Sequence, residues 1–428
     1  MKTPSAVAAL LSALLSSTLA ASSWPSFRGP GATGVSDARA LPISWDVPAK
    51  RNVKWRTSIP GLSHASPIVW GDRIYVVSAR ALEGDSALDM GAEGVVFAKD
   101  ATRHAWMLYA LDRATGRILW ERRAHEGTPR HARHVKGTYA NATPATNGRF
   151  IVAVFGHEGL FCFDMEGRLQ WRRELPVAKA DGSLDPASSP IIFDQVAIVQ
   201  VDVAPEGFIA AYDLETGRER WRTARHEGMT WSTPTVLERD GRAELVVNSP
   251  RWIRGYDART GKQLWELDNR TDGAWDRVAT PFGAGELVIV AGGGGTRPIY
   301  ALRPNGRGEV AWKTERGSPY LPTPIAYQGL LYSLADNGVL SVYDLKDGAQ
   351  LYQRRIITGA TFSASPVAAA GRVYLTSIEG DVFVLRAGRS FLLESTNPVG
   401  EVCMATPALT EGLVVLRTAS AVYGLGPV

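Results

Sequence analysis

The sequence predicts an all-β protein, a single eight-bladed β-propeller whose ring is closed by an N-terminal strand. Two repeated features carry this prediction. A Ser/Thr-Pro dipeptide, which we call a head, occurs eight times, and from the second copy onward consecutive heads are 41 to 47 residues apart. Between them recurs the pattern Asp-x-x-Thr-Gly-x-x-x-Trp with small variations. A period of forty-odd residues is typical of repeat architectures. The heads begin at Ser66, Thr143, Ser189, Thr233, Thr280, Thr323, Ser365 and Thr406.

Each repeat has the pattern of a four-stranded antiparallel meander. Between Ser189 and Trp221, apolar and β-branched runs alternate with breaks at Asp, Gly or Pro, as expected of short strands joined by tight turns. The Gly of each Thr-Gly pair suits a turn position with positive φ, and the Asp can accept hydrogen bonds from the turn backbone. Such meanders repeated around a ring give a propeller, which leaves only short sheet edges.

The N-terminal part of the chain is expected to close the ring. After its head at Thr406 the last repeat has only three strands, whereas residues 53–57 carry an outer-strand pattern upstream of the first head. We therefore predict one propeller domain over residues 53–428. An N-terminal extension over residues 21–52 would precede it and lie across the outside or one face. A repeat ring explains why 428 residues form one domain rather than the three that length alone suggests.

One large aromatic residue marks most of the outer strands. A large side chain at the same place in each repeat is explained by packing between blades, because large aromatics dominate the energetics of protein cores. The series is Trp55, Trp120, Trp171, Trp221, Trp265 and Trp312, with Tyr352 and Leu392 at the two remaining places.

The first residues have the composition of a secretory signal. A short charged start is followed by an apolar run from Ala6 to Leu19 and by small residues, so we predict a signal peptide over residues 1–20, cleaved near Ala20. No other run approaches the ~20 apolar residues of a membrane span. No Cys lies near the cleavage point, which argues against a lipid anchor. We expect the mature protein in the periplasm or outside the cell, without a membrane span.

Cysteine content and net charge say little more about the class of protein. Cys162 and Cys403 fall in the second blade and before the eighth head, too far apart for a disulfide, so we expect two free and mostly buried thiols. A net charge of +4 is too weak to indicate a nucleic-acid partner, and export argues against one.

The repeats resemble those of the pyrroloquinoline-quinone (PQQ) repeat propellers. The resemblance is carried by Asp112–Trp120, Asp213–Trp221 and Asp257–Trp265, and it extends over about residues 53–428. That superfamily contains periplasmic quinoprotein alcohol dehydrogenases and non-enzymatic members such as the outer-membrane assembly lipoprotein BamB. The start of the mature chain, Trp24–Pro30, looks like that of a secreted branch described as PQQ-binding-like. The resemblance implies the fold, but the motif builds blades and does not by itself imply a bound quinone.

These features favour an exported binding or scaffold propeller without catalysis of its own, whose partner is a small-molecule ligand or another exported protein. The alternative is a periplasmic quinoprotein oxidoreductase. By the resemblance it would need PQQ, a Ca²⁺ held by residues such as Glu158, Asn141 and Asn337, and a base such as Asp276, yet none of these lies in a dehydrogenase motif. The chain also lacks the adjacent Cys pair of those enzymes and the Cys-x-x-Cys-His haem signature. A third possibility, a hydrolase or lyase, is not supported, because the sequence contains no Gly-x-Ser-x-Gly nucleophile motif.

All seven histidines map to the face that carries the connections between blades, and loops on one rim of a rigid scaffold often carry function. Two segments there stand out, an insertion over residues 80–104 and a basic connection over residues 122–136. Zinc and similar ions are bound by His and carboxylate. The spacing of His125, His131 and His134 matches no rigid ligand template, so a metal site, an anion site and a solvated loop are all compatible with it.

A second group of side chains lies on the same predicted face around blades four and five. Trp residues outside the packing series are accompanied there by Arg and Tyr, namely Trp231, Trp252, Trp275, Arg251, Arg277 and Tyr320. Aromatic faces can stack on sugar or quinone rings, and Arg binds carboxylates through paired hydrogen bonds. We predict a ring-bearing ligand over the channel mouth here, with His64, Tyr139 and Asn141 on the opposite rim. The alternative is that these Trp residues cap the ends of blades.

Overall fold

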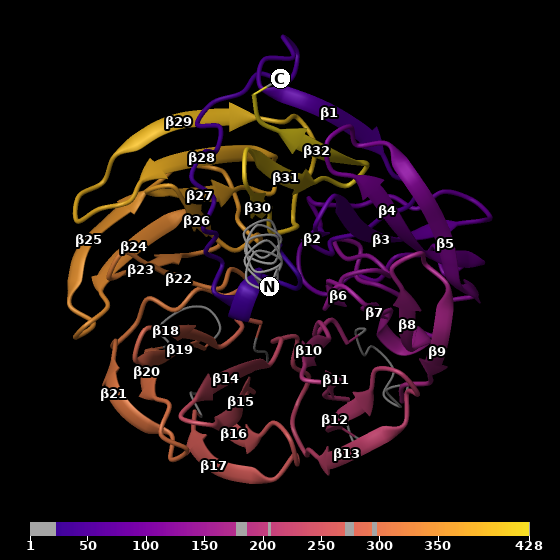
Figure 1. Ribbon diagram of the computed structural model, residues 1–428. Coiled ribbons are helices and arrows are strands. Elements are labelled where there is room, and N and C mark those ends of the chain that lie inside the picture. Colours follow the sequence, from indigo (N-terminus) through magenta and orange to yellow (C-terminus); the bar gives the residue numbers. More distant parts are fainter. Residues whose placement is uncertain (1–22, 177–185, 204–206, 270–277, 293–297, 428) are drawn as a thin grey trace, which may run out of the picture.

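The computed structural model describes residues 23–176, 186–203, 207–269, 278–292 and 298–427, which form a ring of β-sheets (Figure 1). The ring contains eight four-stranded sheets, and neighbouring strands in a sheet pair antiparallel. The predicted all-β, eight-bladed propeller is confirmed. The signal peptide predicted over residues 1–20 lies outside the described residues.

The first four blades follow one another along the chain, and the first strand of each is innermost. Blade 1 comprises β2 (Ile68–Trp70), β3 (Arg73–Ala81), β4 (His104–Asp112) and β5 (Ile118–Gly127). Blade 2 comprises β6 (Ala145–Thr146), β7 (Phe150–Val154), β8 (Leu160–Asp164) and β9 (Leu169–Arg173). Blade 3 comprises β10 (Ile191–Phe193), β11 (Val196–Val201), β12 (Phe208–Asp213) and β13 (Glu219–Ala224). Blade 4 comprises β14 (Thr235–Arg239), β15 (Arg242–Asn248), β16 (Trp252–Asp257) and β17 (Gln263–Asp268).

The remaining four blades repeat this order. Blade 5 comprises β18 (Phe282–Ala284), β19 (Leu287–Ala291), β20 (Ile299–Arg303) and β21 (Glu309–Lys313). Blade 6 comprises β22 (Ile325–Tyr327), β23 (Leu330–Leu334), β24 (Val339–Asp344) and β25 (Gln350–Arg355). Blade 7 comprises β26 (Val367–Ala369), β27 (Arg372–Thr376), β28 (Asp381–Arg386) and β29 (Leu393–Pro398). Blade 8 comprises β30 (Ala408–Thr410), β31 (Leu413–Arg417), β32 (Ala421–Leu425) and the N-terminal β1 (Val53–Ser58), which closes the ring as predicted.

The heads form a closed belt of hydrogen bonds around the ring axis. The backbone N–H of each head residue donates to the side-chain hydroxyl of the next head. The first bond joins Ser66 N to Thr143 Oγ1 at 2.9 Å, and the last joins Thr406 N to Ser66 Oγ at 3.0 Å. The six bonds between them are 3.0 to 3.3 Å long. The belt explains why every head is Ser or Thr, because each head must offer a hydroxyl acceptor to its neighbour.

Six outer-strand Trp residues pack on the turn of the following blade, as their structural interpretation predicts. A Cβ on Gly217, which has φ +64°, would lie 2.6 Å from the Trp171 ring, so a larger residue would clash there. The indole of Trp171 also donates to the Leu214 carbonyl at 2.8 Å. The same packing joins Trp55 to Gly116, Trp120 to Gly167, Trp221 to Gly261, Trp265 to Gly308 and Trp312 to Gly348.

Each of these Trp residues has a small partner on the third strand of its own blade. The partners are Gly424, Ala110, Cys162, Ala211, Gly255 and Ala301. A small residue leaves room for the indole on the sheet. Cys162 is therefore a small core residue. Like Cys403 it is free and buried, as predicted.

Blade 7 departs from the predicted series. We expected Leu392 at the Trp position, but the register of β28 and β29 places Ser395 there, and Leu392 precedes the strand with 46% exposure. The bulge of this strand pair recurs in the other blades, but the connection between β28 and β29, residues 387–392, is longer than the third-to-fourth-strand turns of blades 1 to 6, which moves the position further along the chain. The N-terminal extension packs on β29 instead. Ser395 Oγ donates to the Ile43 carbonyl at 2.5 Å, and Trp45 N donates to Asn397 Oδ1 at 3.0 Å.

The extension crosses the ring on the face of the first-to-second-strand turns (Figure 1). Trp24 is fully buried and exchanges backbone hydrogen bonds of 2.8 and 2.9 Å with Val69 of blade 1. Arg28, also fully buried, donates to the carbonyls of Thr323 and Pro324 at the head of blade 6, at 3.0 and 2.7 Å. The extension thus spans the channel and reaches the level of the heads from this side.

Candidate functional site

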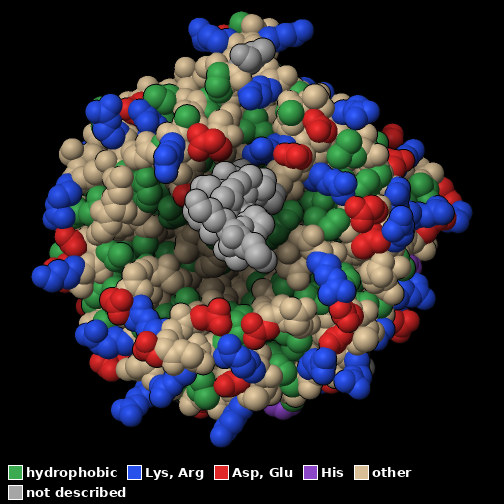
Figure 2. Space-filling model, in the orientation of Figure 1, with side chains coloured by type: hydrophobic (Ala, Val, Ile, Leu, Met, Phe, Trp, Pro, Cys, Tyr) green, Lys and Arg blue, Asp and Glu red, His purple; other side chains and the backbone are tan. Residues whose placement is uncertain are grey.

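The face crossed by the extension shows charges of both signs scattered around the ring and few histidines (Figure 2). Five of the described histidines lie in connections between blades or between second and third strands, whereas His104 begins β4 and His125 lies near the end of β5. His64, for example, lies between β1 and β2, and His157 lies in the 3-10 helix η2 (Gly156–Glu158). The histidine-bearing connections therefore belong to the opposite face.

On that opposite face, the residues two positions before each head form a ring of half-buried side chains, which we call the rim. The residue directly before every head is buried, and the one before it is partly exposed in all eight blades. Because the innermost strands begin directly after the heads, the rim surrounds the propeller axis. Its members are His64, Asn141, Ala187, Trp231, Val278, Leu321, Ser363 and Met404. Three predicted ligand residues, His64, Asn141 and Trp231, thus occupy equivalent positions.

His64, Tyr139 and Asn141 are brought together by two adjacent connections. The backbone N–H of His64 donates to the Ala140 carbonyl at 3.2 Å, and its Nε2 donates to the Lys136 carbonyl at 2.8 Å. Asn141 is held by hydrogen bonds within its own turn. Tyr139 is only 5% exposed, so it supports the rim from below rather than lining it.

His64 is neutral at pH 7. Burial lowers the pKa of its imidazole to about 4, partly opposed by the hydrogen bond to Lys136. The positive charges of Arg133 and Arg417 lower this pKa further. The rim therefore presents an uncharged imidazole held by a backbone carbonyl.

Trp231 and Trp252 lie on blade 4 at different distances from the axis. Trp231 belongs to the rim, whereas Trp252 begins β16 and pairs with Asp268 of the outer strand β17. The guanidinium carbons of Arg251 and Arg254 lie 4.9 and 5.6 Å from the centre of the Trp252 ring. Trp252 is thus already engaged with cations, whereas Trp231 occupies the same repeat position as His64 and Asn141.

The predicted residues of blades 5 and 6 are only partly within the described structure. Trp275, Asp276 and Arg277 lie outside the described residues. Tyr320 is half-buried three positions before the head at Thr323, directly beside a rim position. It can therefore border a ligand on the axis.

The described residues that a PQQ-bound Ca²⁺ would need are each engaged by their own neighbours. Glu158 accepts from the Arg130 backbone at 3.0 Å and faces His125 Nε2 at 3.3 Å. Asn141 is held in its own turn, and Asn337 lies in blade 6, where it accepts from a neighbouring backbone N–H at 3.3 Å. Within the described ranges, no three His, Cys, Asp or Glu side chains are grouped to hold a metal ion. Since Ca²⁺ takes six to eight oxygen ligands, these residues do not fit it.

The histidines of the basic connection do not share a ligand site. His125 faces Glu158, His131 stacks on His157 with ring centres 4.6 Å apart, and His134 Nε2 donates to the backbone of the insertion at 3.0 Å. Burial lowers the pKa of His157 to about 4, opposed by its hydrogen bond to a backbone carbonyl. The three predicted metal candidates are therefore engaged separately.

The insertion and the basic connection instead pack together around one buried arginine. Arg133, 3% exposed, donates to Asp100 at 2.6 Å and to the carbonyls of Ala87 and Gly137 at 2.7 and 2.8 Å. The insertion is thereby an ordered platform. It carries Val95, which at 68% is the most exposed large hydrophobic side chain in the part of the chain that the structure describes.

A buried polar network between blades 3 and 4 was not anticipated from the sequence. Arg225 and Asp202 are fully buried as an ion pair with distances of 2.8 and 3.0 Å. The guanidinium also donates to the Tyr256 hydroxyl at 2.8 Å and to Ser249 Oγ at 2.5 Å. Since the charges are paired and bonded, this network is structural. The only signal for it was a charged residue directly after an outer strand.

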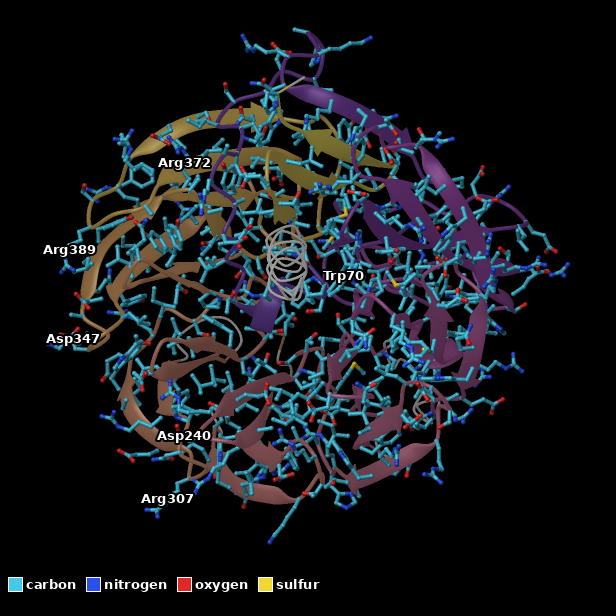
Figure 3. The ribbon with its side chains drawn as sticks, in the orientation of Figure 1. Trp70, Asp240, Arg307, Asp347, Arg372 and Arg389 are labelled. Carbon is cyan, nitrogen blue, oxygen red and sulfur yellow. The ribbon has the colours of Figure 1, made fainter. Side chains whose placement is uncertain are left out.

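Two cavities open on the face crossed by the extension, away from the rim. The larger, of about 440 Å³, lies between blades 4 and 5 beside Asp240 (Figure 3). Arg239 and Glu286 in its wall pair with each other at 2.5 Å, so charge there is largely compensated. The smaller, of about 250 Å³, lies between the extension and the innermost strands of blades 2 to 4. None of the predicted ligand residues that the structure describes lines either cavity.

Solved structures share this fold at low sequence identity. BamB from Moraxella catarrhalis superposes with a TM-score of 0.57 and 14% identity, over 81% of this chain and 98% of that one. A europium-containing methanol dehydrogenase gives a TM-score of 0.67 and 13% identity, over 96% and 92%. The quinohemoprotein alcohol dehydrogenase from Comamonas testosteroni gives 0.66 and 14%, over 97% and 82%. None of the curated proteins matches the sequence.

A family model also matches most of the chain. The model described as outer membrane protein assembly factor BamB matches residues 35–224 and 249–397. In the described residues, no helix has the length and apolar character that a membrane span requires. Because the match covers well over half of the chain, the protein belongs to this BamB-like family of PQQ-repeat propellers.

Proposed function

We propose that the protein is an exported binding propeller that receives a ring-bearing ligand at the rim. The observation that supports this most directly is the equivalent placement of Trp231, His64 and Asn141 around one axis. Small-molecule binding sites usually have a mainly apolar wall with a few fixed polar groups. Here Trp231 offers an aromatic face, His64 a neutral imidazole and Asn141 a fixed amide. The other rim positions are mainly apolar.

In this proposal the ligand stacks on Trp231, and Trp252 or Trp275 extends the aromatic wall. Arg251 and Arg277 meet a carboxylate of the ligand, and Tyr320 borders it. Stacking on an aromatic face contributes about 0.5–1.5 kcal/mol beyond the area buried.

The insertion over residues 80–104 offers a surface for a second class of partner, another exported protein. Val95 is exposed on a platform that Arg133 holds in place, so an apolar contact is offered without loss of loop entropy on binding. The name of the structural neighbour BamB is that of an outer-membrane assembly factor, which supports a protein-binding role for the fold.

We further propose that the chain is exported, with cleavage near Ala20. The test is the N-terminal sequence of the protein recovered from the periplasm or culture medium of its host. A mature start near Ala21 is expected. Retention of Met1 in a cytoplasmic fraction would refute export.

PQQ is a suitable probe, because it carries fused rings and carboxylates and also tests the quinoprotein alternative. The mature protein is titrated with PQQ, with and without Ca²⁺, while tryptophan fluorescence and the melting temperature are followed. A ligand bound only to the folded state adds about 2.7 kcal/mol at a hundredfold excess over Kd. We expect any binding to be independent of Ca²⁺ and no dye-linked alcohol oxidation. Ca²⁺-dependent binding with oxidation would establish the quinoprotein function instead.

Paired variants locate the site. Trp231→Ala should weaken binding of the probe with little change in melting temperature, since a rim residue supports little of the core. Trp265→Ala should lose ~3–5 kcal/mol of stability, as large core truncations do. Loss of stability in Trp231→Ala equal to that in Trp265→Ala, with unchanged binding, would make Trp231 structural.

A further inference from the structure

Four arginines are buried in the described residues, and one of them differs from the rest. Arg28, Arg133 and Arg225 all donate to carbonyls, carboxylates or hydroxyls. Arg417 is 1% exposed, and its Nε, Nη1 and Nη2 atoms are all buried without a hydrogen-bond partner in the described structure. A guanidinium carries five N–H donors, and an unpaired buried charge is among the most costly groups in a protein interior.

Among the described residues, no carboxylate forms an ion pair with Arg417. Glu401 is near enough to act on it electrostatically, but its oxygens are used by other donors. They accept from Arg56 at 2.8 Å, Tyr423 at 2.6 Å and Thr418 at 2.7 Å. Burial lowers the pKa of Arg417 to about 10, so its side chain is still a cation at neutral pH. A buried cation without a counter-charge calls for an anion from outside the chain.

Arg417 ends β31 and faces the seam between blades 8 and 1. It acts electrostatically on His64 and Tyr109, which both belong to the blade 1 side of that seam. The Tyr109 hydroxyl is buried near Ser78 without a hydrogen bond of ordinary geometry. The Cys403 thiol donates to the Arg417 carbonyl at 3.0 Å and fixes the backbone there. The unpaired donors of Arg417 and Tyr109 thus belong to the two blades that border this seam.

The repeat itself shows that a charge is not needed at this place. The position lies on the second strand, eleven residues after the head in seven blades and fifteen residues after it in blade 4; except in the longer β3 of blade 1, it is at or next to the end of that strand. Its occupants from blade 1 to blade 8 are Val77, Val154, Gln200, Asn248, Ala291, Leu334, Thr376 and Arg417. Packing between blades is therefore compatible with small or apolar side chains, and Arg417 is the one charged occupant.

We propose that Arg417 binds the carboxylate of a small organic acid in the seam between blades 8 and 1, with the Tyr109 hydroxyl as a further donor. A planar carboxylate matches the guanidinium, which can donate two parallel hydrogen bonds to it. Formate and acetate are the simplest probes of this class of ligand. This site is independent of the ring-bearing ligand proposed at Trp231.

The test uses the mature chain and three variants. Arg417→Leu introduces the residue of blade 6, Arg417→Lys keeps the charge without the planar fork, and Thr376→Leu is the matched control at the equivalent position of blade 7. Melting temperatures are measured at constant ionic strength and pH 7.5 in fluoride, chloride, formate and acetate, and binding of formate and acetate is measured by calorimetry.

We expect a saturable rise in melting temperature with formate or acetate in the wild type and in Thr376→Leu. The rise should be weaker in Arg417→Lys and absent in Arg417→Leu. Without carboxylates, Arg417→Leu should be as stable as the wild type or more stable, because a bare buried cation has been replaced by an apolar residue. Equal responses in all four proteins, a saturable response to chloride alone, or a large loss of stability in carboxylate-free Arg417→Leu would each overturn the proposal.

Discussion

The glycine of each Thr-Gly turn meets two requirements, a positive φ and close contact with an indole, and these can be separated. Gly241 lies in the turn between β14 and β15, and its φ of +73° is similar to the +64° of Gly217. Gly217 packs on a Trp, whereas nothing lies within 4 Å of a Cβ placed on Gly241. Gly241→Ala should therefore cost about 1 kcal/mol of unfolding free energy from backbone strain. Gly217→Ala should cost roughly 1–3 kcal/mol more from overpacking. Denaturant unfolding of both variants checks this, and equal losses would show that the Trp171 contact is unimportant.

Two buried histidines make stability depend on acidity. His64 and His157 each have a pKa of about 4 in the folded protein, against an ordinary value of 6.5. The unfolded chain therefore binds more protons between these values, so stability is full above pH 6.5 and falls as the pH drops toward 4. The loss is roughly 3 kcal/mol for each histidine, at 1.36 kcal/mol per pKa unit.

Denaturant unfolding at pH 7 and pH 4.5 measures this loss. His157→Gln should remove about half of the pH dependence, because glutamine does not titrate. An unchanged pH dependence in that variant would place the titrating groups elsewhere.

At the scale of elements, the repeat pattern predicted the strands well because each blade is a local meander with its own turns. What it did not predict depends on contacts between blades. The belt of head hydrogen bonds required knowing that successive heads are neighbours in space, and the position of Ser395 required knowing the length of the turn between β28 and β29. His64, Asn141 and Trp231 could be chosen because they precede heads, whereas Arg417 resembles any strand-end residue.

The insertion in blade 1 should lose its fixed structure when its buried arginine is removed. Arg133→Met leaves Asp100 without its cationic partner and removes the bonds to the carbonyls of Ala87 and Gly137. We expect rapid proteolysis within residues 82–103 while the propeller stays folded, because the blades do not depend on this loop. Arg123→Met is the control, since Arg123 is 60% exposed in a surface ion pair worth little. A protected insertion in Arg133→Met would show that backbone pairing alone holds it.

Acid should also release the insertion from its fixed structure in the wild-type protein. Burial opposes ionisation of Asp100, but hydrogen bonds from Arg133 and Ser86 outweigh it and lower the pKa of this carboxyl below its ordinary value of 3.8. The stabilisation is thus present above pH 3.8 and is lost as the pH falls through the folded pKa. Proteolysis of the insertion by an acid-tolerant protease should begin below pH 3.8. Opening at pH 5 would exclude Asp100 as the titrating group.

For the molecule as a whole, the N-terminal segment has two separable roles, one at the axis and one at the ring closure. Trp24 and Arg28 are fully buried against innermost strands, whereas β1 supplies the outer strand of blade 8. Ring closure could be predicted by counting strands, because the last repeat is one strand short. The path of the extension across the axis could not be predicted in this way, because it depends on contacts that run from Trp24 at blade 1 to Arg28 at blade 6.

Two truncations of the mature chain separate these roles. A chain that begins at residue 39 loses Trp24 and Arg28 but keeps β1, and it should fold as a ring that is less stable by at least ~3–5 kcal/mol, the cost of a large core truncation. A chain that begins at residue 59 also loses β1, so the unpaired edge of β32 is exposed and aggregation is expected. Melting curves and light scattering distinguish the two. If the shorter chain stayed monomeric and melted at the same temperature as the longer one, β1 would not close the ring in solution, and blade 8 would be stable with three strands.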